Sequence, residues 1–427
     1  MPAPERRTPA DLVAVAGIVL VVVLAATVLW WTSDVRGTTV RTATVPLPST
    51  APPAPTALPP SLAEVWRATS SATEVPVVAG AVVVTGAVTG AVTGAVTGAV
   101  TGAATGNGGE VTGREPTTGA PRWSYRRDKP LCTVGAAFER VLAVYRQGDS
   151  CSEVTALEPV DGSRGPQRTG ALGPSTRLLA EPAHVTATGL HYLEVWRNDL
   201  VRTLQYGALP SPVKPEAQPR TGCSYGSIGA ASGLVGVVER CPGESADRLT
   251  VQQSDPDEPD QPEIEFSTLL PGRGAVLVAM TSDRVAVALP GPGRLVVLDD
   301  AGRSIAEYPL DVPHADLRSD PPGGVAAVSA DTGGSYWFTG SATVALGGTD
   351  LRPLWRVSGT LGPGTLLAGR LLVPVPDGLA VLDTASGEQL DLFPVERGRW
   401  TGPVRTTAVA DVVLEQRGDT LVALRGP

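Results

Sequence analysis

The stretch RLLVPVPDGLAVLDTASGEQLDLFPV, Arg370 to Val395, decides the fold. It contains three short apolar segments, and each of the first two ends at a turn rich in glycine and aspartate. Apolar runs bounded by turn residues are typical of β-strands. The middle segment ends at Leu382, directly before the turn Asp383 to Gly387. This strand–turn–strand unit is the template with which the rest of the chain can be compared.

Several other stretches repeat this unit. Copies occur at Arg284 to Leu310, Val154 to Gly165 and Val111 to Arg127, with a weaker copy at Thr343 to Gly359. Aligning the residue before the turn gives eight marks, at Arg114, Leu157, Leu204, Gln252, Leu298, Leu346, Leu382 and Leu424. The marks lie 36 to 48 residues apart. A period of this size, with about four strands per unit, indicates a β-propeller.

The two ends of the repeat region complement each other. The chain ends at TLVALRGP, just after a third strand, so the last unit lacks its fourth strand. LAEVWRAT, Leu62 to Thr69, looks like a fourth strand without a unit, and its Trp66 takes the place of Trp123 and Trp355 in their units. We therefore predict an all-β, eight-bladed β-propeller that closes by pairing these ends. The alternatives are seven blades, because three copies are degenerate, or a pair of β-sandwiches.

The N-terminal region predicts one membrane crossing. Leu12 to Trp31 is a run of 20 residues without charge. As a helix it spans roughly 30 Å, the thickness of the hydrocarbon core. Arg6 and Arg7 precede it and favour a cytoplasmic N-terminus. We assign residues 1–11 to the cytoplasm and 12–32 to a transmembrane helix; a cleaved signal peptide is the alternative.

Two segments have biased composition. Residues 33–61 are rich in proline, threonine and alanine, and we interpret them as a semi-rigid linker that holds the propeller, residues 62–427, off the membrane. Thr85 to Ala104 reads TGAV four times and then TGAA. Glycine at every fourth position makes a helix costly, at roughly 1 kcal/mol each. We interpret residues 85–106 as a low-complexity surface loop in the first blade.

Charge and composition exclude some partners. The chain carries 34 Lys and Arg residues against 43 Asp and Glu, a net charge of -9, so nucleic acid is not an expected partner. The 49 glycines and 40 prolines disfavour a helical bundle. The tryptophans at 66, 123, 196 and 355 lie at blade strands and suit packing between blades.

Four cysteines form two local pairs. Cys132 and Cys151 are 19 residues apart, and Cys223 and Cys241 are 18 apart. We predict one disulfide in each of two blades, tying two adjacent strands and contributing roughly 3 kcal/mol each. Disulfides beyond a membrane anchor predict an extracytoplasmic propeller. The alternatives are four reduced thiols in a cytoplasmic propeller, or crossed pairing between blades. A zinc site would need close C-x-x-C pairs, and the sequence contains none.

Other motifs do not fit the chemistry they suggest. Gly222 to Gly226 matches G-x-S-x-G, but a nucleophile elbow needs a helix after its turn. The acidic stretch Asp255 to Glu263 contains three prolines, which oppose the wrapping that calcium needs. Asp299 and Asp383 lie in tight turns, where aspartate accepts hydrogen bonds from backbone amides. We therefore predict no catalytic residue, no metal site and no cofactor.

The L-x-x-L-D-x-x-x-G-x unit resembles the repeat of propellers related to pyrroloquinoline-quinone (PQQ) dehydrogenases. With one anchor and a proline-rich linker, the layout resembles membrane-anchored PQQ-like propeller proteins of actinobacteria. Dehydrogenases of this kind hold their cofactor at the axial funnel and use a vicinal disulfide, a catalytic aspartate and a calcium shell. This sequence has no Cys-Cys step. We expect a non-enzymatic scaffold that binds a protein of the cell envelope, as envelope-assembly propeller lipoproteins do; a quinone-dependent dehydrogenase is the alternative.

Overall fold

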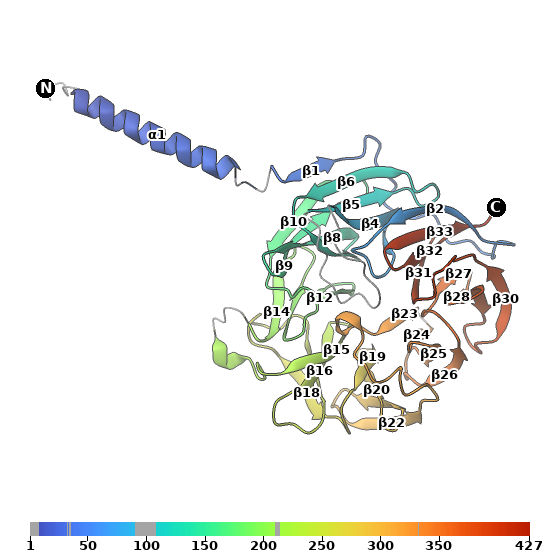
Figure 1. The fold of residues 1–427 in the computed structure, drawn as a ribbon. Helices are drawn as coiled ribbons and strands as arrows, with labels where there is room; N and C mark the ends of the chain where they lie inside the picture. The colour runs from blue at the N-terminus through green and yellow to red at the C-terminus, as the bar shows by residue number, and fades with distance from the viewer. Residues whose placement is uncertain (1–7, 32, 34–35, 90–107, 210–213, 332) are drawn as a thin grey trace.

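A single long helix precedes the β-region (Figure 1). The computed structural model describes residues 8–31, 33, 36–89, 108–209, 214–331 and 333–427. Helix α1 (Pro9–Trp31) has 23 residues, and none of them is buried. The backbone N–H of Thr8 donates to the Asp11 carboxylate at 2.7 Å, which caps the first turn. The helix is long and apolar enough for a membrane anchor or a signal sequence, and the cytoplasmic N-terminus stays a prediction.

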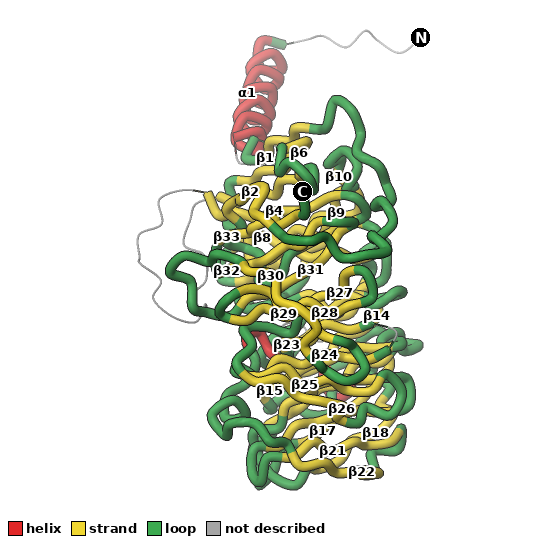
Figure 2. Tube along the Cα trace, turned by 90° about the vertical axis from the view of Figure 1, so that its right-hand side faces the viewer, coloured by secondary structure: helices red, strands yellow, loops and turns green. Residues whose placement is uncertain are grey.

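Eight antiparallel sheets surround a common axis in Figure 1, and Figure 2 shows the ring from the side. In each blade the first strand lies at the hub and the fourth at the rim. Blades 1 and 2 contain β3 (Val77–Ala79), β4 (Val82–Thr89), β5 (Gly108–Arg114), β6 (Pro121–Arg127), β7 (Leu131–Ala137), β8 (Arg140–Gln147), β9 (Ser150–Leu157) and β10 (Arg164–Thr169). Blades 3 and 4 contain β11 (Leu178–Ala180), β12 (Val185–Ala187), β13 (Tyr192–Trp196), β14 (Arg202–Gly207), β15 (Ser224–Ala231), β16 (Leu234–Arg240), β17 (Arg248–Gln253) and β18 (Ile264–Leu269).

The second half of the ring repeats this order. Blades 5 and 6 contain β19 (Val276–Met280), β20 (Arg284–Leu289), β21 (Arg294–Asp299), β22 (Ser304–Pro309), β23 (Ala327–Ala330), β24 (Gly334–Phe338), β25 (Ala342–Gly347) and β26 (Pro353–Ser358). Blades 7 and 8 contain β27 (Thr365–Leu367), β28 (Arg370–Val375), β29 (Gly378–Leu382), β30 (Gln389–Pro394), β31 (Val404–Val409), β32 (Val412–Arg417), β33 (Thr420–Arg425) and β2 (Ala63–Thr69).

The ring closes as the sequence predicts. Strand β2, from the start of the ordered region, pairs antiparallel with β33, from the end of the chain. The register runs from Ala63 opposite Arg425 to Thr69 opposite Thr420. The eight-bladed propeller is confirmed, and the seven-bladed and sandwich alternatives are wrong.

Seven of the eight sequence marks lie on third strands, but Leu204 lies on β14, a fourth strand. The third strand of blade 3 is β13, which ends at Trp196. Its turn is closed by the Arg197 N–H, which donates to the Val201 carbonyl, and Leu200 adopts a φ of 61° there. A leucine thus occupies a left-handed position that glycine takes in the template unit, so this turn has no glycine signature.

Trp66 on β2 and Trp123 on β6 each dock a fourth strand onto the next blade. The indole of Trp66 donates to the Pro116 carbonyl at 2.7 Å, and that of Trp123 donates to the Pro159 carbonyl at 2.7 Å. Trp355 makes the same kind of contact, with the Thr384 carbonyl at 2.9 Å. Trp196 differs because it lies on a third strand, where it is fully buried between blades 2 and 3. The predicted inter-blade role of these tryptophans is confirmed.

Part of the segment assigned to the linker, residues 33–61, lies on the propeller. Strand β1 (Thr38–Arg41) pairs with β6 as a fifth strand of blade 1. Farther along, the Leu47 N–H donates to the Val160 carbonyl at 2.8 Å, and the Leu47 side chain is buried. Only residues 32–37 therefore separate α1 from the first strand.

The TGAV tract begins within a strand. Its first residues, Thr85 to Thr89, belong to β4 and pair with β5 down to Thr89 opposite Gly108. The tract therefore continues into the connection between the second and third strands of blade 1. Most of the predicted loop at 85–106, from residue 90 onward, lies outside the described residues.

Candidate functional site

One face of the ring carries the connections between blades. Because neighbouring strands are antiparallel, each connection between blades lies at the same end as the connection between second and third strands. We call this side the loop face and the opposite side the turn face. Both disulfides lie on the loop face, where β4 ends and β5 begins.

A long connection crosses the loop face from the rim to the hub. We call residues 310–326, which join β22 to β23, the hub loop. Its Leu317 side chain is buried in the core of blades 5 and 6. Asp320 then forms a two-bonded ion pair with Arg240 of blade 4, with both distances 2.5 Å. The loop is thereby fastened to a blade that it does not connect.

The tip of the hub loop lies inside the ring, at the loop-face end of the hub (Figure 1). It forms the short 3₁₀ helix η2 (Pro322–Gly324), drawn orange inside the ring between β15 and β23 in Figure 1. The Thr188 hydroxyl of blade 3 donates to the Gly323 carbonyl at 3.0 Å. Gly323 has a φ of 63°, and a Cβ there would lie 2.5 Å from Cγ of Arg177. The approach is so close that glycine is required.

An ion pair lies beside this tip. The Arg177 guanidinium donates to the carboxylate of Glu74, which precedes blade 1. Blades 1 and 3 are therefore joined at the hub by charged side chains, and the hub loop covers them. The loop-face end of the axis is occupied by the chain's own residues.

Both predicted disulfides are present. Cys132 and Cys151 have Cα atoms 6.0 Å apart, and Cys223 and Cys241 have Cα atoms 4.2 Å apart. The second bridge ties the adjacent strands β15 and β16 at their open end, as predicted. The first one joins β7 to β9, which are not adjacent, so the predicted strand pairing is wrong there.

The first bridge reaches over β8 because of a bulge. The register of β7 shifts between Leu131 and Thr133, which leaves Cys132 as the extra residue. Cys151 lies directly after the β8–β9 turn, at the same edge of the sheet. A bulge of this kind has no sequence signal of its own, so spacing alone indicated the partner cysteine but not the strands.

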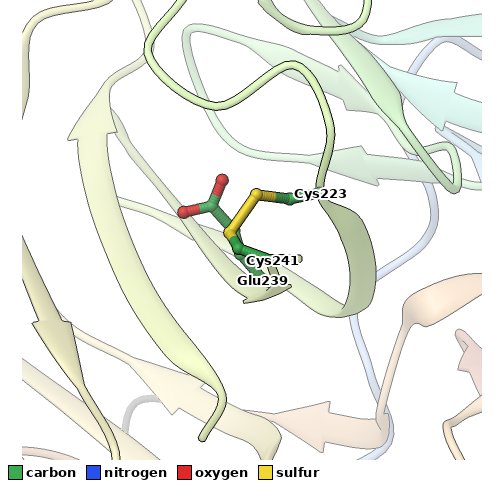
Figure 3. A group of neighbouring side chains, drawn as sticks. All are labelled: Cys223, Glu239 and Cys241. Carbon is green, nitrogen blue, oxygen red and sulfur yellow. A yellow bond between two sulfur atoms is a disulfide. The ribbon is translucent and has the colours of Figure 1, made fainter. Parts of the chain in front are cut away.

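Glu239 lies close to the second disulfide (Figure 3). Cys223, Glu239 and Cys241 are near enough to hold a metal ion, but the two sulfurs are bonded to each other. A disulfide offers no thiolate to a metal. Among the residues that the structure describes, this is the group of side chains that comes nearest to a metal site.

The Glu239 carboxylate already has protein partners. It accepts hydrogen bonds from the Tyr206 hydroxyl at 2.7 Å, from Nε of Arg220 at 2.9 Å and from the Thr250 hydroxyl at 2.5 Å. Burial, together with the Glu239 charge, raises the pKa of Tyr206, so this hydroxyl keeps its proton. The cluster joins blades 3 and 4 and has a structural role.

The G-x-S-x-G motif lies in a strand. Ser224 begins β15, and β16 follows it, so the helix that a nucleophile elbow needs is not there. His191 lies nearby, but its Nδ1 is 3.0 Å from the Cys223 carbonyl oxygen. His184 lies 3.7 Å from the carboxylate of Asp255, on the side of the acidic stretch. The histidines and Ser224 therefore form no triad.

The turn aspartates behave as predicted. Asp299 accepts hydrogen bonds from the backbone N–H groups of Ala301 at 3.0 Å and Arg303 at 2.9 Å. Asp383 accepts them from Ala385 and Ser386, both at 3.1 Å. These backbone hydrogen bonds, from Arg303 and Ser386 first, lower the pKa of each carboxyl. Both residues are turn caps.

The structure adds one feature that the sequence did not indicate. A cavity of about 410 Å³ opens on the loop face of blade 5. Its lining includes Arg273, His314 and Arg318, and among the residues that the structure describes no aspartate or glutamate lines it. These three residues lie in three separate positions along two interblade loops rich in proline and glycine. Basic residues in an acidic chain were the only signal available, and their spacing follows no known motif.

No protein-family model and no curated protein matches the chain. Solved structures do resemble it. The computationally designed protein Ika8 is 12% identical, with a TM-score of 0.54, over 86% of this chain and 99% of its own. The quinohemoprotein alcohol dehydrogenase from Comamonas testosteroni is 14% identical, with a TM-score of 0.52, over 86% of this chain and 77% of its own. BamB from Moraxella catarrhalis is 13% identical, with a TM-score of 0.49, over 85% and 99%. At these identities the likeness shows the fold alone, which is that of an eight-bladed β-propeller.

Proposed function

We propose that this protein is a membrane-anchored, non-enzymatic propeller that binds a protein of the cell envelope through its loop face. The hub loop is the observation that carries the proposal. In a propeller enzyme of this fold the cofactor lies at the axial funnel, and here η2 and the Arg177–Glu74 pair lie at the loop-face end of the axis. The long interblade connections rest instead on a rigid ring, an arrangement suited to recognition.

The proposed location outside the cytoplasm rests on the cysteines. All four are in disulfides, and none is free. Disulfides persist in oxidising compartments, and α1 supplies an anchor that would leave the propeller on the far side of the membrane from the N-terminus. A protein partner also agrees with the net charge of -9, which does not favour nucleic acid.

Site-specific crosslinking in membranes tests the proposal. A photo-crosslinking amino acid replaces Trp400, which is exposed in the loop-face connection between β30 and β31. The matched control replaces Leu390, which is exposed on β30 at the rim. We expect one crosslinked partner from position 400 and none from position 390. The same partner from both positions, or none from either, contradicts a loop-face interface.

A second measurement addresses the enzyme alternative. The purified full chain in detergent is mixed with pyrroloquinoline quinone and calcium, and absorbance, Tm and dye reduction with alcohols or sugars are followed. The proposal expects no change. Calcium-dependent uptake of the quinone, or dye reduction, would overturn it in favour of the dehydrogenase.

A further inference from the structure

The cavity on the loop face of blade 5 has an unusual charge for this molecule. The whole chain carries a net charge of -9, yet the cavity is lined by two arginines and a histidine and, within the described part of the chain, by no aspartate or glutamate. Its volume of about 410 Å³ is in the range of small-molecule sites. Positive groups that converge on a cavity favour an anionic occupant.

Arg318 has the guanidinium that is free to bind. Among the described residues it forms no ion pair and no side-chain hydrogen bond. The carboxylates nearest to it in the chain already have partners: Asp316 accepts from Thr339 and Ser341, and Asp320 accepts from Arg240. The charge of Arg318 is therefore not neutralised within the hub loop.

Arg273 and His314 are held in place at the cavity wall. Arg273 donates to the backbone carbonyls of Glu244 and Ser245, which fixes its guanidinium, and its charge also helps to lower the pKa of the Glu244 carboxyl. Nδ1 of His314 lies 3.2 Å from the Pro290 carbonyl oxygen, which can only accept, so Nδ1 carries the proton in this bond. The ring's Nε2 is left for another partner.

Backbone forms part of the remaining wall. Gly272 and Gly291 line the cavity, and a Cβ at either position would meet no atom within 4 Å. The space in front of these glycines is open, so a ligand can approach the chain closely. Pro271 and Pro290 supply an apolar side.

We propose that this cavity binds a small phosphate monoester, with the phosphate between Arg273 and Arg318 and the organic part over the apolar side. Two arginines match the two charges of such a phosphate, and guanidinium groups bind phosphate oxygens in pairs. The cavity lies on the same face as the proposed protein interface, but the binding of a small phosphate monoester can be measured without the partner.

Calorimetry on the full chain in detergent tests the site. The probes are inorganic phosphate, glucose 6-phosphate and glucose, at constant ionic strength set with chloride. We expect saturable one-to-one binding of both phosphates, with glucose 6-phosphate at least about tenfold tighter because its sugar fills the cavity. Binding of glucose alone, or no saturable binding of glucose 6-phosphate, overturns the proposal. Equal affinity for inorganic phosphate and glucose 6-phosphate would overturn the proposal that the cavity recognises a monoester.

A pair of variants locates the binding. Arg318→Gln removes the charge of the unpartnered guanidinium and should weaken glucose 6-phosphate binding about tenfold or more. The control Arg399→Gln changes an exposed arginine in the β30–β31 connection, on the same face but outside the cavity. It should bind as the parent does. Equal weakening in both variants, with Tm unchanged in both, would show screening by general surface charge and overturn the site.

Discussion

Replacing glycine at the turn beneath a docking tryptophan should destabilise the ring by a predictable amount. Gly162 lies in the β9–β10 turn of blade 2 with a φ of 76°, and a Cβ there would lie 2.7 Å from ring carbons of Trp123. The Trp123 side chain is 2% exposed and held by its hydrogen bond to Pro159, so it has little room to move. Gly162→Ala therefore combines backbone strain with a steric clash.

A second glycine in the same blade separates these two effects. Gly148, in the β8–β9 turn, has a φ of 60°, and a Cβ there would meet nothing within 4 Å. Gly148→Ala should cost only the left-handed strain of an L-residue, about 1–2 kcal/mol. Gly162→Ala adds overpacking against Trp123, about 1–3 kcal/mol more. The difference between the two variants measures the clash.

Urea unfolding of the full chain in detergent, followed by far-ultraviolet circular dichroism, supplies both free energies. In a Trp123→Phe background the smaller ring should relieve part of the clash, so the extra cost of Gly162→Ala should shrink. Equal costs for the two glycine variants would refute the docking argument. So would an extra cost that Trp123→Phe leaves unchanged.

Three further substitutions test other contacts of the propeller. The Glu415 side chain has no exposed surface and pairs with Arg397 and Arg417. Glu415→Gln should therefore lower the free energy of unfolding in urea by about 3–5 kcal/mol. Glu64→Gln, in the more exposed pair with Arg67, should lower it by less than about 1 kcal/mol. Replacing Cys223 and Cys241 together by serine should lower the free energy of unfolding by roughly 3 kcal/mol, and alkylation of the parent chain in denaturant without reductant should label no thiol. Backbone hydrogen bonds lower the pKa of Asp383 in the folded protein, so the charged carboxylate stabilises the fold above pH 3.8, the ordinary pKa. This stabilisation is lost as the pH falls through the lower pKa of the folded state. On acidification, Tm should therefore fall less steeply in Asp383→Asn than in the parent chain or in the control Asp300→Asn.

The ring could be predicted from sequence because its physical cause repeats. A four-stranded blade needs neighbours on both faces, so each unit must carry the same alternation of apolar strands and turns, as Arg370 to Val395 does. The closing strand was visible because Trp66 keeps the position of Trp123 and Trp355. The mark for blade 3 was placed on the wrong strand because Leu200 stands where the other turns have a glycine.

The loop face could not be predicted in the same way. The cavity gathers Arg273, Pro290 and Arg318 from three separate segments, and only the folded ring brings them together. The hub loop carries no repeat, because its contacts with Thr188 and Arg240 are made to blades that it does not connect. Contacts between distant segments select residue types, such as arginine or glycine, but they impose no regular spacing that could be recognised in the sequence.

For the proline-rich segment, composition alone overestimated the distance that the chain can span between α1 and the propeller. Fully extended, residues 33–61 would span several tens of ångströms, as a linker at about 3.1 Å per residue would. Proline does not, however, prevent a segment from lying on a surface, and this one gains a strand before its first proline and backbone hydrogen bonds from Ala43 and Leu47 to blade 2. Only residues 32–37 are left between α1 and β1, and they can span at most roughly 20–25 Å.

This short connection constrains the proposed interface. Thr38 pairs with Arg127, which ends β6 on the loop face, so the chain from α1 enters the propeller at the loop-face edge of blade 1. If α1 is the anchor, that edge cannot be more than roughly 20–25 Å from the end of the helix. A partner of the loop face must then fit beside the membrane or lie within it, which a long free stalk would not have required. Partners that are themselves membrane-bound satisfy this geometry, because they reach the face without displacing the propeller from its anchor.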